Sequence, residues 1–228
     1  MKIIKETCTK GTRIILGNKK RQYINECIDM LISQGFVEIQ IPILQDYKTF
    51  ENKVGEENNN LMYRFTDRGG RDLVLAPEYT SVIINLKDTF KYQKDVKLFY
   101  VQQCFRGENT QFLRWREFTQ LGIEIINPTQ DYSDYLIELV KKLINFNDEQ
   151  YKVITNLKRG LDYYNDFTFE IELNDKPISV CGGGSYSNGI GAALGICRLL
   201  ELMSNDKEFE TRYKFKYEMK DSFKRKTF

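Results

Sequence analysis

Arginines and an acidic residue gather around one short polar loop in this 228-residue chain. Arg106 and Arg114 stand at the two ends of the loop, and Arg116 follows two residues later. Glu108 lies inside the loop. Guanidinium groups on a rigid support suit a polyphosphate ligand, because each can bind two oxygen atoms at once. A solvated hairpin with ion pairs on its surface would contain the same residues, so their spacing alone leaves both interpretations open.

Two predicted strands position this loop. Residues 98–105 and 115–126 are rich in aromatic and β-branched side chains, and the turn-forming residues 107–111 separate them. Successive side chains of a strand point to opposite faces. One face of the second strand therefore carries a mixed polar set: Arg114, Arg116, Phe118, Gln120, Gly122 and Glu124. A half-buried strand normally has an apolar face, so this polar face indicates a lined cavity.

The same residues resemble a known family. Phe105-Arg106-x-Glu108, followed by Arg114-x-Arg116-Glu117-Phe118-x-Gln120-Leu121-Gly122-x-Glu124, closely resembles motif 2 of the class II aminoacyl-tRNA synthetases, and the histidyl branch is the nearest match. The resemblance covers roughly residues 10 to 203. It implies an α+β fold in which an antiparallel sheet of six or seven strands is flanked by helices. It also implies a homodimer formed through residues 21–42, which resemble motif 1.

Two further segments resemble the histidine-binding signatures of that branch. Residues 159–164, with the sequence Arg-Gly-Leu-Asp-Tyr-Tyr, match the first signature. Residues 182–186 resemble the second, usually Gly-Gly-Arg-Tyr, with Ser185 in place of the arginine. Considered without the family, the glycines fit neither nucleotide-binding fingerprint, because Gly-Lys-Ser/Thr and the third glycine of Gly-x-Gly-x-x-Gly are missing.

Two other matches also depart from the family pattern. Residues 76–80, Ala-Pro-Glu-Tyr-Thr, resemble the junction Arg-Pro-Glu-x-Thr, but Ala76 stands where the family has arginine. Residues 189–200 resemble motif 3, usually Gly-x-Glu-Arg, and there Cys197 replaces the glutamate while Arg198 is kept. Each of these departures, like Ser185, removes a family charge near the expected site.

The resemblance implies a role for each matching residue. Arg106 and Arg159 would be the catalytic residues, at the α-phosphate of ATP. Arg114 and Arg198 would hold the far phosphates, and Glu108 would meet the adenine. Glu78 would hold the α-amino group of histidine and Tyr164 would face the imidazole; the other histidine-binding positions are Thr80, Gln120, Glu124 and Tyr186. ATP brings Mg²⁺, for which no side-chain ligand is assigned.

The implied reaction is the activation of an amino acid. The carboxylate of histidine attacks the α-phosphate of ATP, pyrophosphate leaves, and histidyl-AMP delivers its histidine to a tRNA or to another acceptor. Because the attacking carboxylate is already ionised, the reaction needs no general base. The complete absence of histidine from the chain is therefore compatible with it.

A non-catalytic histidine sensor is the alternative function. It would resemble the synthetase-like regulatory subunit of the short-form ATP phosphoribosyltransferase, which lacks an anticodon-binding domain. We expect no such domain here after motif 3, and no insertion domain within residues 127–158. A sensor has no reason to keep the ATP-site residues Arg106, Glu108, Arg114, Arg159 and Arg198 together, and this favours an enzyme. The substitutions at Ala76, Ser185 and Cys197 favour the sensor.

Composition sets limits on these hypotheses. With 41% hydrophobic and 29% charged residues the chain is typical of soluble globular proteins. No segment approaches the roughly 20 apolar residues that span a bilayer, and the N-terminus does not resemble a secretory signal. Five widely spaced cysteines without a C-x-x-C pair indicate reduced thiols in a cytoplasm. The lack of histidine excludes His-based triads and His-ligated metals.

We expect one synthetase-like catalytic core at residues 1–205 and a basic, aromatic tail at residues 206–228. An edge strand with solvated lysines is the commoner interpretation of that tail, and a contact with single-stranded nucleic acid is the other. Spacing and turn residues predict the remaining elements. These are helices at 21–34, from Pro77 onward and at 131–146, strands at 36–42 and 167–173, a hairpin at 61–76, and a mobile loop at 46–60.

Overall fold

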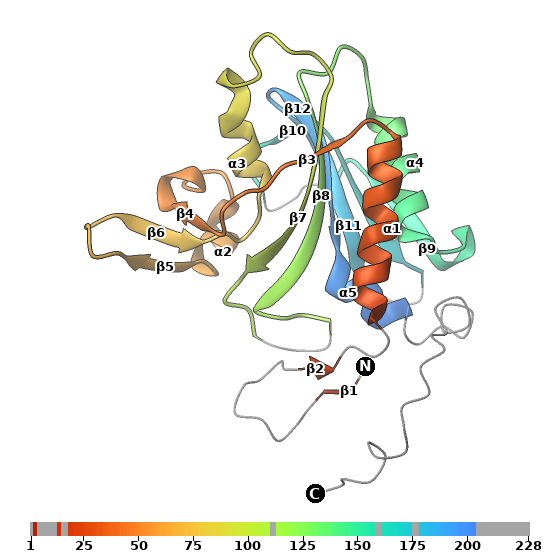
Figure 1. Ribbon diagram of the computed structural model, residues 1–228, viewed down its shortest axis with the longest axis horizontal. Helices are drawn as coiled ribbons and strands as arrows, with labels where there is room; N and C mark the ends of the chain where they lie inside the picture. The colour runs from red at the N-terminus through yellow and green to blue at the C-terminus, as the bar shows by residue number, and fades with distance from the viewer. Residues whose placement is uncertain are drawn as a thin grey trace, which may run out of the picture.

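A seven-stranded sheet forms the centre of the molecule (Figure 1). The computed structural model describes residues 2–3, 13–14, 18–109, 113–157, 161–174 and 178–203. The strand order is β3-β7-β8-β12-β11-β10-β9, and every neighbouring pair is antiparallel except β3 with β7. The predicted antiparallel sheet flanked by helices is confirmed. The strands are β3 (Val37–Glu38), β7 (Val96–Phe105), β8 (Glu117–Ile126), β9 (Tyr151–Thr155), β10 (Tyr164–Leu173), β11 (Ser179–Tyr186) and β12 (Gly189–Gly195).

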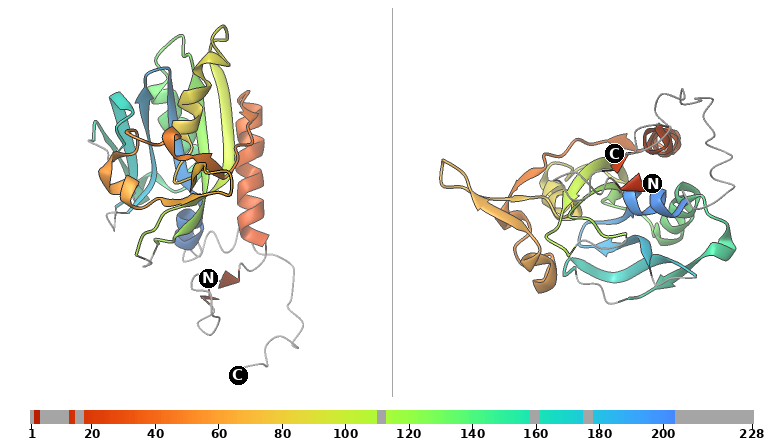
Figure 2. Two further views of the ribbon diagram at one scale, coloured as in Figure 1. Left: turned by 90° about the vertical axis from the view of Figure 1, so that its left-hand side faces the viewer. Right: turned by 90° about the horizontal axis from the view of Figure 1, so that it is seen from below.

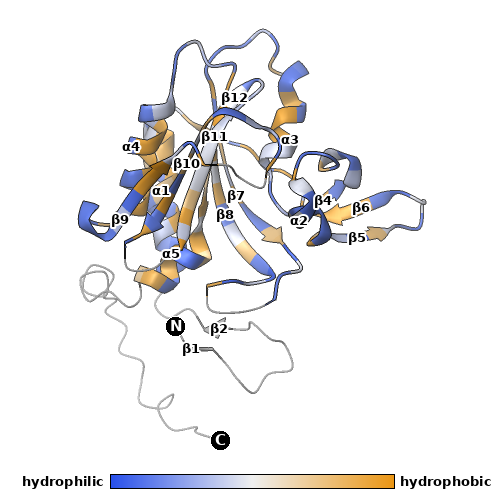
Figure 3. Cartoon of the chain, turned by 180° about the vertical axis from the view of Figure 1, so that it is seen from behind, coloured by the Kyte–Doolittle hydropathy of each residue, from blue (hydrophilic) through white to orange (hydrophobic). Residues whose placement is uncertain are grey.

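Three helices cover one face of this sheet: α1 (Lys19–Ser33), α4 (Ser133–Ile144) and α5 (Ile196–Met203). Helices and strands are apolar where they meet (Figure 3). Leu121 and Ile123 of β8 alternate toward this face and are fully buried. Burial of each such side chain contributes roughly 1.5–3 kcal/mol, which holds the helices on the sheet. No helix in the described ranges is long and apolar enough to cross a bilayer.

A smaller layer lies against the other face of the sheet, beside β7 (Figures 1 and 2). It contains α2 (Gly55–Asn60), α3 (Thr80–Ile84) and a second sheet of β4 (Leu44–Asp46), β6 (Asp72–Leu75) and β5 (Tyr63–Thr66). The predicted hairpin at 61–76 is thus confirmed. Apolar side chains of this layer pack with Leu98, Tyr100 and Cys104 of β7 and form a second core.

The segment at 46–60 differs from the predicted mobile loop. It contains a 3-10 turn at Tyr47–Thr49, followed by α2. Phe50 and Val54, between these two elements, are 0% and 2% exposed and belong to the second core. Because most residues of the segment are polar, its composition did not indicate that these two apolar side chains pack it against the rest of the fold.

Three element boundaries also differ from the sequence predictions. The helix expected from Pro77 begins at Thr80, and the carboxylate of Glu78 accepts hydrogen bonds from the main-chain N–H of Ser81 in its first turn. The predicted strand at 36–42 shortens to the two residues of β3. Strand β8 begins at Glu117, so the preceding arginines lie in the loop and not on the strand.

Glycines on the open face of the sheet allow large side chains to lie across neighbouring strands. Gly122 of β8 pairs with Tyr100 of β7, and a Cβ atom at Gly122 would lie 1.9 Å from Cζ of the tyrosine ring. The same relation joins Glu124 with Gly191, Tyr164 with Gly184, and Tyr186 with Gly189. Any side chain at these glycines would occupy the volume of its large polar neighbour.

We expect Gly122→Ala to destabilise the protein by roughly 1–3 kcal/mol, because the added methyl group displaces the buried ring of Tyr100. Gly69→Ala is the matched control: a Cβ there meets no atom closer than 3.3 Å, and that atom belongs to the flexible side chain of Asp67. Urea unfolding of both variants measures the difference. Equal stability of the two variants would contradict this packing argument.

Candidate functional site

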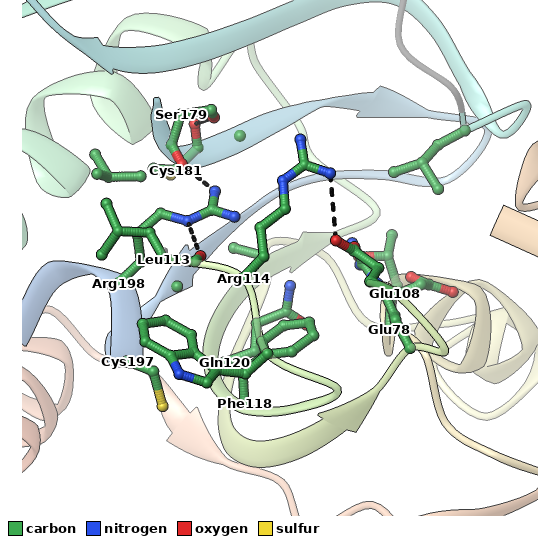
Figure 4. Close-up of a pocket in the computed structure, with 18 of the residues that line it drawn as sticks. Glu78, Glu108, Leu113, Arg114, Phe118, Gln120, Ser179, Cys181, Cys197 and Arg198 are labelled. Atoms are coloured by element: carbon green, nitrogen blue, oxygen red, sulfur yellow. Dashed lines mark hydrogen bonds and ion pairs between the residues drawn. The ribbon is translucent and has the colours of Figure 1, made fainter. Parts of the chain in front are cut away.

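A polar cavity opens on the face of the large sheet that carries the smaller layer (Figure 4). Its floor is the backbone of β8, β11 and β12, where Gly182, Ala193 and Gly195 present little or no side chain. The walls come from the segment before α3, the loop between β7 and β8, the segment before β10, and the start of α5. The predicted site residues in the lining are Glu78, Thr80, Arg106, Glu108, Arg114, Gln120, Tyr164 and Arg198.

The other predicted site residues are placed differently. Glu124 and Tyr186 do not line the cavity, but both connect to its lining through hydrogen bonds. Arg159, predicted as a catalytic residue, lies outside the described residues. The tail predicted at 206–228 also lies outside them.

Three arginines converge at one end of the cavity. Arg106 follows β7, Arg114 precedes β8 and Arg198 lies in the first turn of α5. Nη1 of Arg114 lies 3.3 Å from Oε2 of Glu108. Burial lowers the pKa of Arg198, and the positive charges of Arg114 and Arg106 also lower it, while Glu108 opposes them. Cations gathered in this way favour a bound anion, and their planar groups suit phosphate oxygens.

Arg198 is held by main-chain oxygen atoms from two sides. Its Nε donates to the carbonyl of Leu113 at 3.2 Å, and its Nη1 donates to the carbonyl of Ser179 (Figure 4). Leu113 is buried and has φ of 61°, a left-handed conformation that is rare for a bulky residue. Arg198 therefore also stabilises the strained turn that leads into Arg114.

Glu78 lies beside Arg106, whose Nε donates to the carbonyl of the preceding Pro77 at 2.9 Å, and it is 4% exposed. Both of its carboxylate oxygens accept from the N–H of Ser81 at 3.2 Å, and the hydroxyl of Tyr163 donates to Oε2 at 3.3 Å. Burial raises the pKa of Glu78, although these hydrogen bonds and the charge of Arg106 partly counteract it. A buried carboxyl group beside a cavity is a partner for a cationic ligand, whose charge favours the ionised form.

Glu124 is a second buried carboxyl group, and it is 0% exposed. Thr80 donates from Oγ1 to one oxygen and Tyr186 donates from its hydroxyl to the other, both at 2.8 Å. Burial raises the pKa of Glu124 to about 8, with a further contribution from the nearby Glu78. Glu124 therefore keeps its proton at neutral pH until a ligand or a change of pH removes it.

Gln120 and Tyr164 complete the polar lining. Oε1 of Gln120 accepts from Sγ of Cys104 at 3.3 Å and from the hydroxyl of Tyr100 at 3.5 Å. Because its oxygen is occupied in this way, Gln120 offers its amide N–H groups to the cavity. The ring of Tyr164 lies over Gly184.

Several residues of the site were not predicted from the sequence. Tyr163 lines the cavity and binds Glu78, although the sequence analysis gave a role only to its neighbour Tyr164. Phe118 also lines the cavity, with the guanidinium of Arg106 lying 5.2 Å from the centre of its ring. Phe118 could have been predicted as a lining residue from its place on the polar face of the second strand. Cys104 does not line the cavity; it belongs to the second core and supports the lining by donating to Oε1 of Gln120.

The three departures from the family pattern have different surroundings. Ala76 is fully buried in the second core. Ser185 does not line this cavity; its hydroxyl donates to Oδ1 of Asn165 at 2.8 Å and accepts from the N–H of Phe167 at 3.0 Å. Cys197 lines the cavity, and its sulfur accepts from the N–H of Thr119 at 3.3 Å. Cys197 is thus the departure that directly changes the lining.

Across the described ranges of the chain, no three Cys, Asp or Glu residues are grouped so that they could hold a metal ion. A Mg²⁺ ion in this cavity would depend on phosphate oxygens and water, as it does in many nucleotide sites.

Substitution of Glu124 tests the electrostatic description. An unfolded chain loses the Glu124 proton near the ordinary pKa of 4.5, whereas the folded protein keeps it to about 8. Between these values the folded state binds one more proton, so this group lowers the free energy of unfolding as the pH rises. Glu124→Gln should therefore gain stability relative to the parent across this window, by at most about 5 kcal/mol.

Urea unfolding at pH 5 and pH 8 provides the measurement. Glu138→Gln, which removes a largely exposed carboxylate from α4, is the matched control. If Glu124→Gln and Glu138→Gln change by the same amount between the two pH values, Glu124 does not retain its proton in the folded state.

Comparison with known proteins gives a consistent picture. The model of the family described as histidyl-tRNA synthetase matches residues 17–154. The histidine–tRNA ligase of Sulfurisphaera tokodaii is 36% identical over 126 residues, which cover 52% of this chain and 30% of the relative. That of Methanocaldococcus jannaschii is 35% identical over 130 residues, 55% of this chain and 31% of the relative. The matched region thus spans about a third of these curated relatives.

Solved structures share the fold over most of the chain. Apo histidyl-tRNA synthetase from S. aureus has a TM-score of 0.70 at 26% identity, covering 93% of this chain and 72% of that one. A Bacillus halodurans protein described as an ATP phosphoribosyltransferase regulatory subunit/histidyl-tRNA synthetase has a TM-score of 0.69 at 16% identity. The match covers 88% of this chain and 84% of the B. halodurans chain. At this identity the similarity concerns the fold alone.

Proposed function

Because the chain belongs to the histidyl-tRNA synthetase family, we propose that it binds histidine and ATP and joins them as histidyl-AMP. The acceptor of the histidine would be a tRNA or another molecule. The observation that carries this proposal is the arrangement of the cavity. The lining combines Arg106, Arg114 and Arg198 with the buried carboxyl group of Glu78, and Thr80 connects it to the buried Glu124, so that one ligand rich in phosphate and one rich in basic nitrogen fit side by side.

The arginine end suits the reacting part of ATP. In-line attack of a carboxylate on the α-phosphate needs positioning and neutralisation of charge, and it needs no base. Arg106 would bind the α-phosphate, with Arg159 as the second expected ligand there. Arg114 and Arg198 would hold the far phosphates, and Glu108 would contact the adenine. Mg²⁺ would arrive with the phosphates and neutralise part of their charge.

The carboxyl groups suit histidine. Glu78 would pair with the α-ammonium group, and Tyr164 with Glu124 behind it would recognise the imidazole. Thr80 and Tyr186 would hold Glu124 in place, and Gln120 would donate from its amide. Ionising the buried carboxyl groups costs free energy, and a cationic ligand offsets that cost. The carboxyl groups therefore select ligands with basic nitrogen atoms.

A histidine-sensing regulatory subunit is the second candidate function. The observation that favours it is Cys197 in the cavity lining, where the family has a carboxylate. Ala76 and Ser185 likewise lack the family's charges. Such a subunit would keep the carboxyl groups of the cavity and bind histidine without activating it.

We also propose that two copies of the chain form a homodimer through α1, β3 and the adjoining small sheet. Leu44, Tyr63 and Phe65 share one face of that sheet by register and are 47%, 36% and 42% exposed. Val37 of β3 is 63% exposed. An exposed apolar surface of this kind is typical of a protein–protein interface. The buried thiols of the described cysteines suit a reducing cytoplasm.

We expect Phe65→Asp to convert a dimer into a monomer, because the carboxylate would be desolvated in the interface. Analytical ultracentrifugation across a range of concentrations measures this change. Tyr92→Asp is the control, since Tyr92 lies outside the small sheet and is 88% exposed. A parent protein that is monomeric at every concentration would contradict the proposed dimer.

The proposed reaction is tested by exchange of radiolabelled pyrophosphate into ATP in the presence of histidine. We expect exchange with histidine and not with other amino acids. Arg106→Gln should reduce its rate by about 10²–10³-fold, the usual effect of removing a charged group that stabilises the transition state. Arg71→Gln, at the exposed tip of the β5–β6 hairpin, is the control for loss of an arginine.

The outcomes separate the two candidate functions. Exchange with histidine alone would support the adenylate-forming enzyme. Histidine binding in calorimetry without exchange would instead support the sensor. If the parent protein neither binds histidine nor exchanges pyrophosphate, both proposals are wrong.

A further inference from the structure

Strand β9 is the outermost strand at one end of the large sheet, and in the described part of the chain it pairs only with β10. The N–H of Asn156 donates to the carbonyl of Thr168 at 2.7 Å, and the N–H of Asn174 donates to the carbonyl of Gln150 at 3.0 Å. Hydrogen-bonded residues alternate along an antiparallel strand, so the even-numbered residues of β9 face β10. The residues whose main-chain N–H and C=O groups point outward are Tyr151, Val153 and Thr155.

This outer edge of β9 is open to another strand. Among the described residues, no main-chain hydrogen bond reaches the outward groups. Thr155 is exposed and Val153 is half-buried. The strand contains no proline, and the ammonium of its one lysine, Lys152, lies 3.4 Å from Oε2 of Glu172. An edge without proline or an unpaired lysine invites pairing with a further strand.

The two faces of the sheet differ beside this edge. Tyr151 belongs to the core beneath α1, α4 and α5, and Val153 packs against the same core. The opposite face carries Glu170 and Glu172 of β10, because side chains alternate along that strand. A strand added to β9 would therefore have apolar neighbours on one face and acidic neighbours on the other.

Residues 212–217 of this chain match both faces. Their sequence, Arg-Tyr-Lys-Phe-Lys-Tyr, alternates basic and aromatic side chains. In a strand, this alternation places the three cations on one face and the three aromatic rings on the other. The rings match the apolar neighbours at the edge of β9, and the cations match Glu170 and Glu172.

The chain that precedes this segment is long enough to reach the edge. Helix α5 ends at Met203 and packs on β8 and β12. A strand beyond β9 lies four strand spacings from β12, about 19 Å at roughly 4.8 Å per spacing. Residues 204–211 can span up to about 26 Å when extended. The connection therefore has length to spare.

We propose that residues 212–217 pair with the outer edge of β9 as an additional strand of the large sheet. The aromatic side chains lie on the face covered by the helices, and the basic side chains lie on the face of Glu170 and Glu172. This inference is independent of the proposed function, because β9 contributes no residue to the cavity lining.

Amide hydrogen exchange, followed by NMR on the full chain, tests the pairing. The test variant combines Lys214→Pro with Phe215→Pro, so that one lost N–H faces β9 in any register. The outward N–H groups of β9 should be protected in the parent and should exchange at least about ten-fold faster in this variant. The N–H groups of Lys152 and Ile154, which face β10, should stay protected in both proteins.

The matched control combines Phe223→Pro with Lys224→Pro, which changes the same residue types outside the alternating segment. It should exchange as the parent does. Equal exchange of the outward N–H groups in the parent and the test variant would overturn the proposal, and so would a loss of protection that includes Lys152 and Ile154. Protection that disappears when the parent is diluted would also overturn it, since a second copy of the chain would then cover the edge.

Discussion

The site depends on a steric constraint: large polar side chains of one strand lie flat across glycines of the next. Tyr100 and Glu124 each occupy the space that a side chain at Gly122 or Gly191 would need, with a Cβ at either glycine only 1.9 Å from them. Without a Cβ at these positions, the neighbouring side chains can be buried next to the cavity and still reach its lining. The glycine-rich segment of β11 therefore provides a flat, rigid floor, and it does not form a phosphate-binding loop.

This floor brings two opposite electrostatic environments into one cavity. Arginines from separate elements repel one another, and buried carboxyl groups with raised pKa values lie beside them. Glu108 offsets part of the positive charge through its ion pair with Arg114, and hydrogen bonds partly offset the burial of the two carboxyl groups. Such an arrangement lowers stability and is typical of a site built for charged ligands. The hydroxyl of Thr80 donates to Glu124, and that of Tyr163 donates to Glu78.

Much of this architecture could be predicted from the sequence, because periodicity reports burial directly. The stripe on α4 and the alternation in β8 predicted both elements, and eight of the residues that the family motifs singled out lie in the cavity lining. Contacts set by register or by tertiary packing could not be predicted in the same way. Cys104 of the second core donates to Gln120 of the cavity lining, and Phe50 anchors a segment whose composition suggested a mobile loop. Local spacing contains no information on either contact.

The two separate cores have a consequence for cooperativity. One core holds α1, α4 and α5 against the sheet, and the other holds α3 and the small sheet against β7. Elements with separate cores can open as separate units, each with its own free energy of opening. The cavity takes Glu78 and Thr80 from the smaller unit and Arg198 from the larger one. A ligand that contacts both units binds only when they are docked together, so its binding energy turns two partly independent folding units into one.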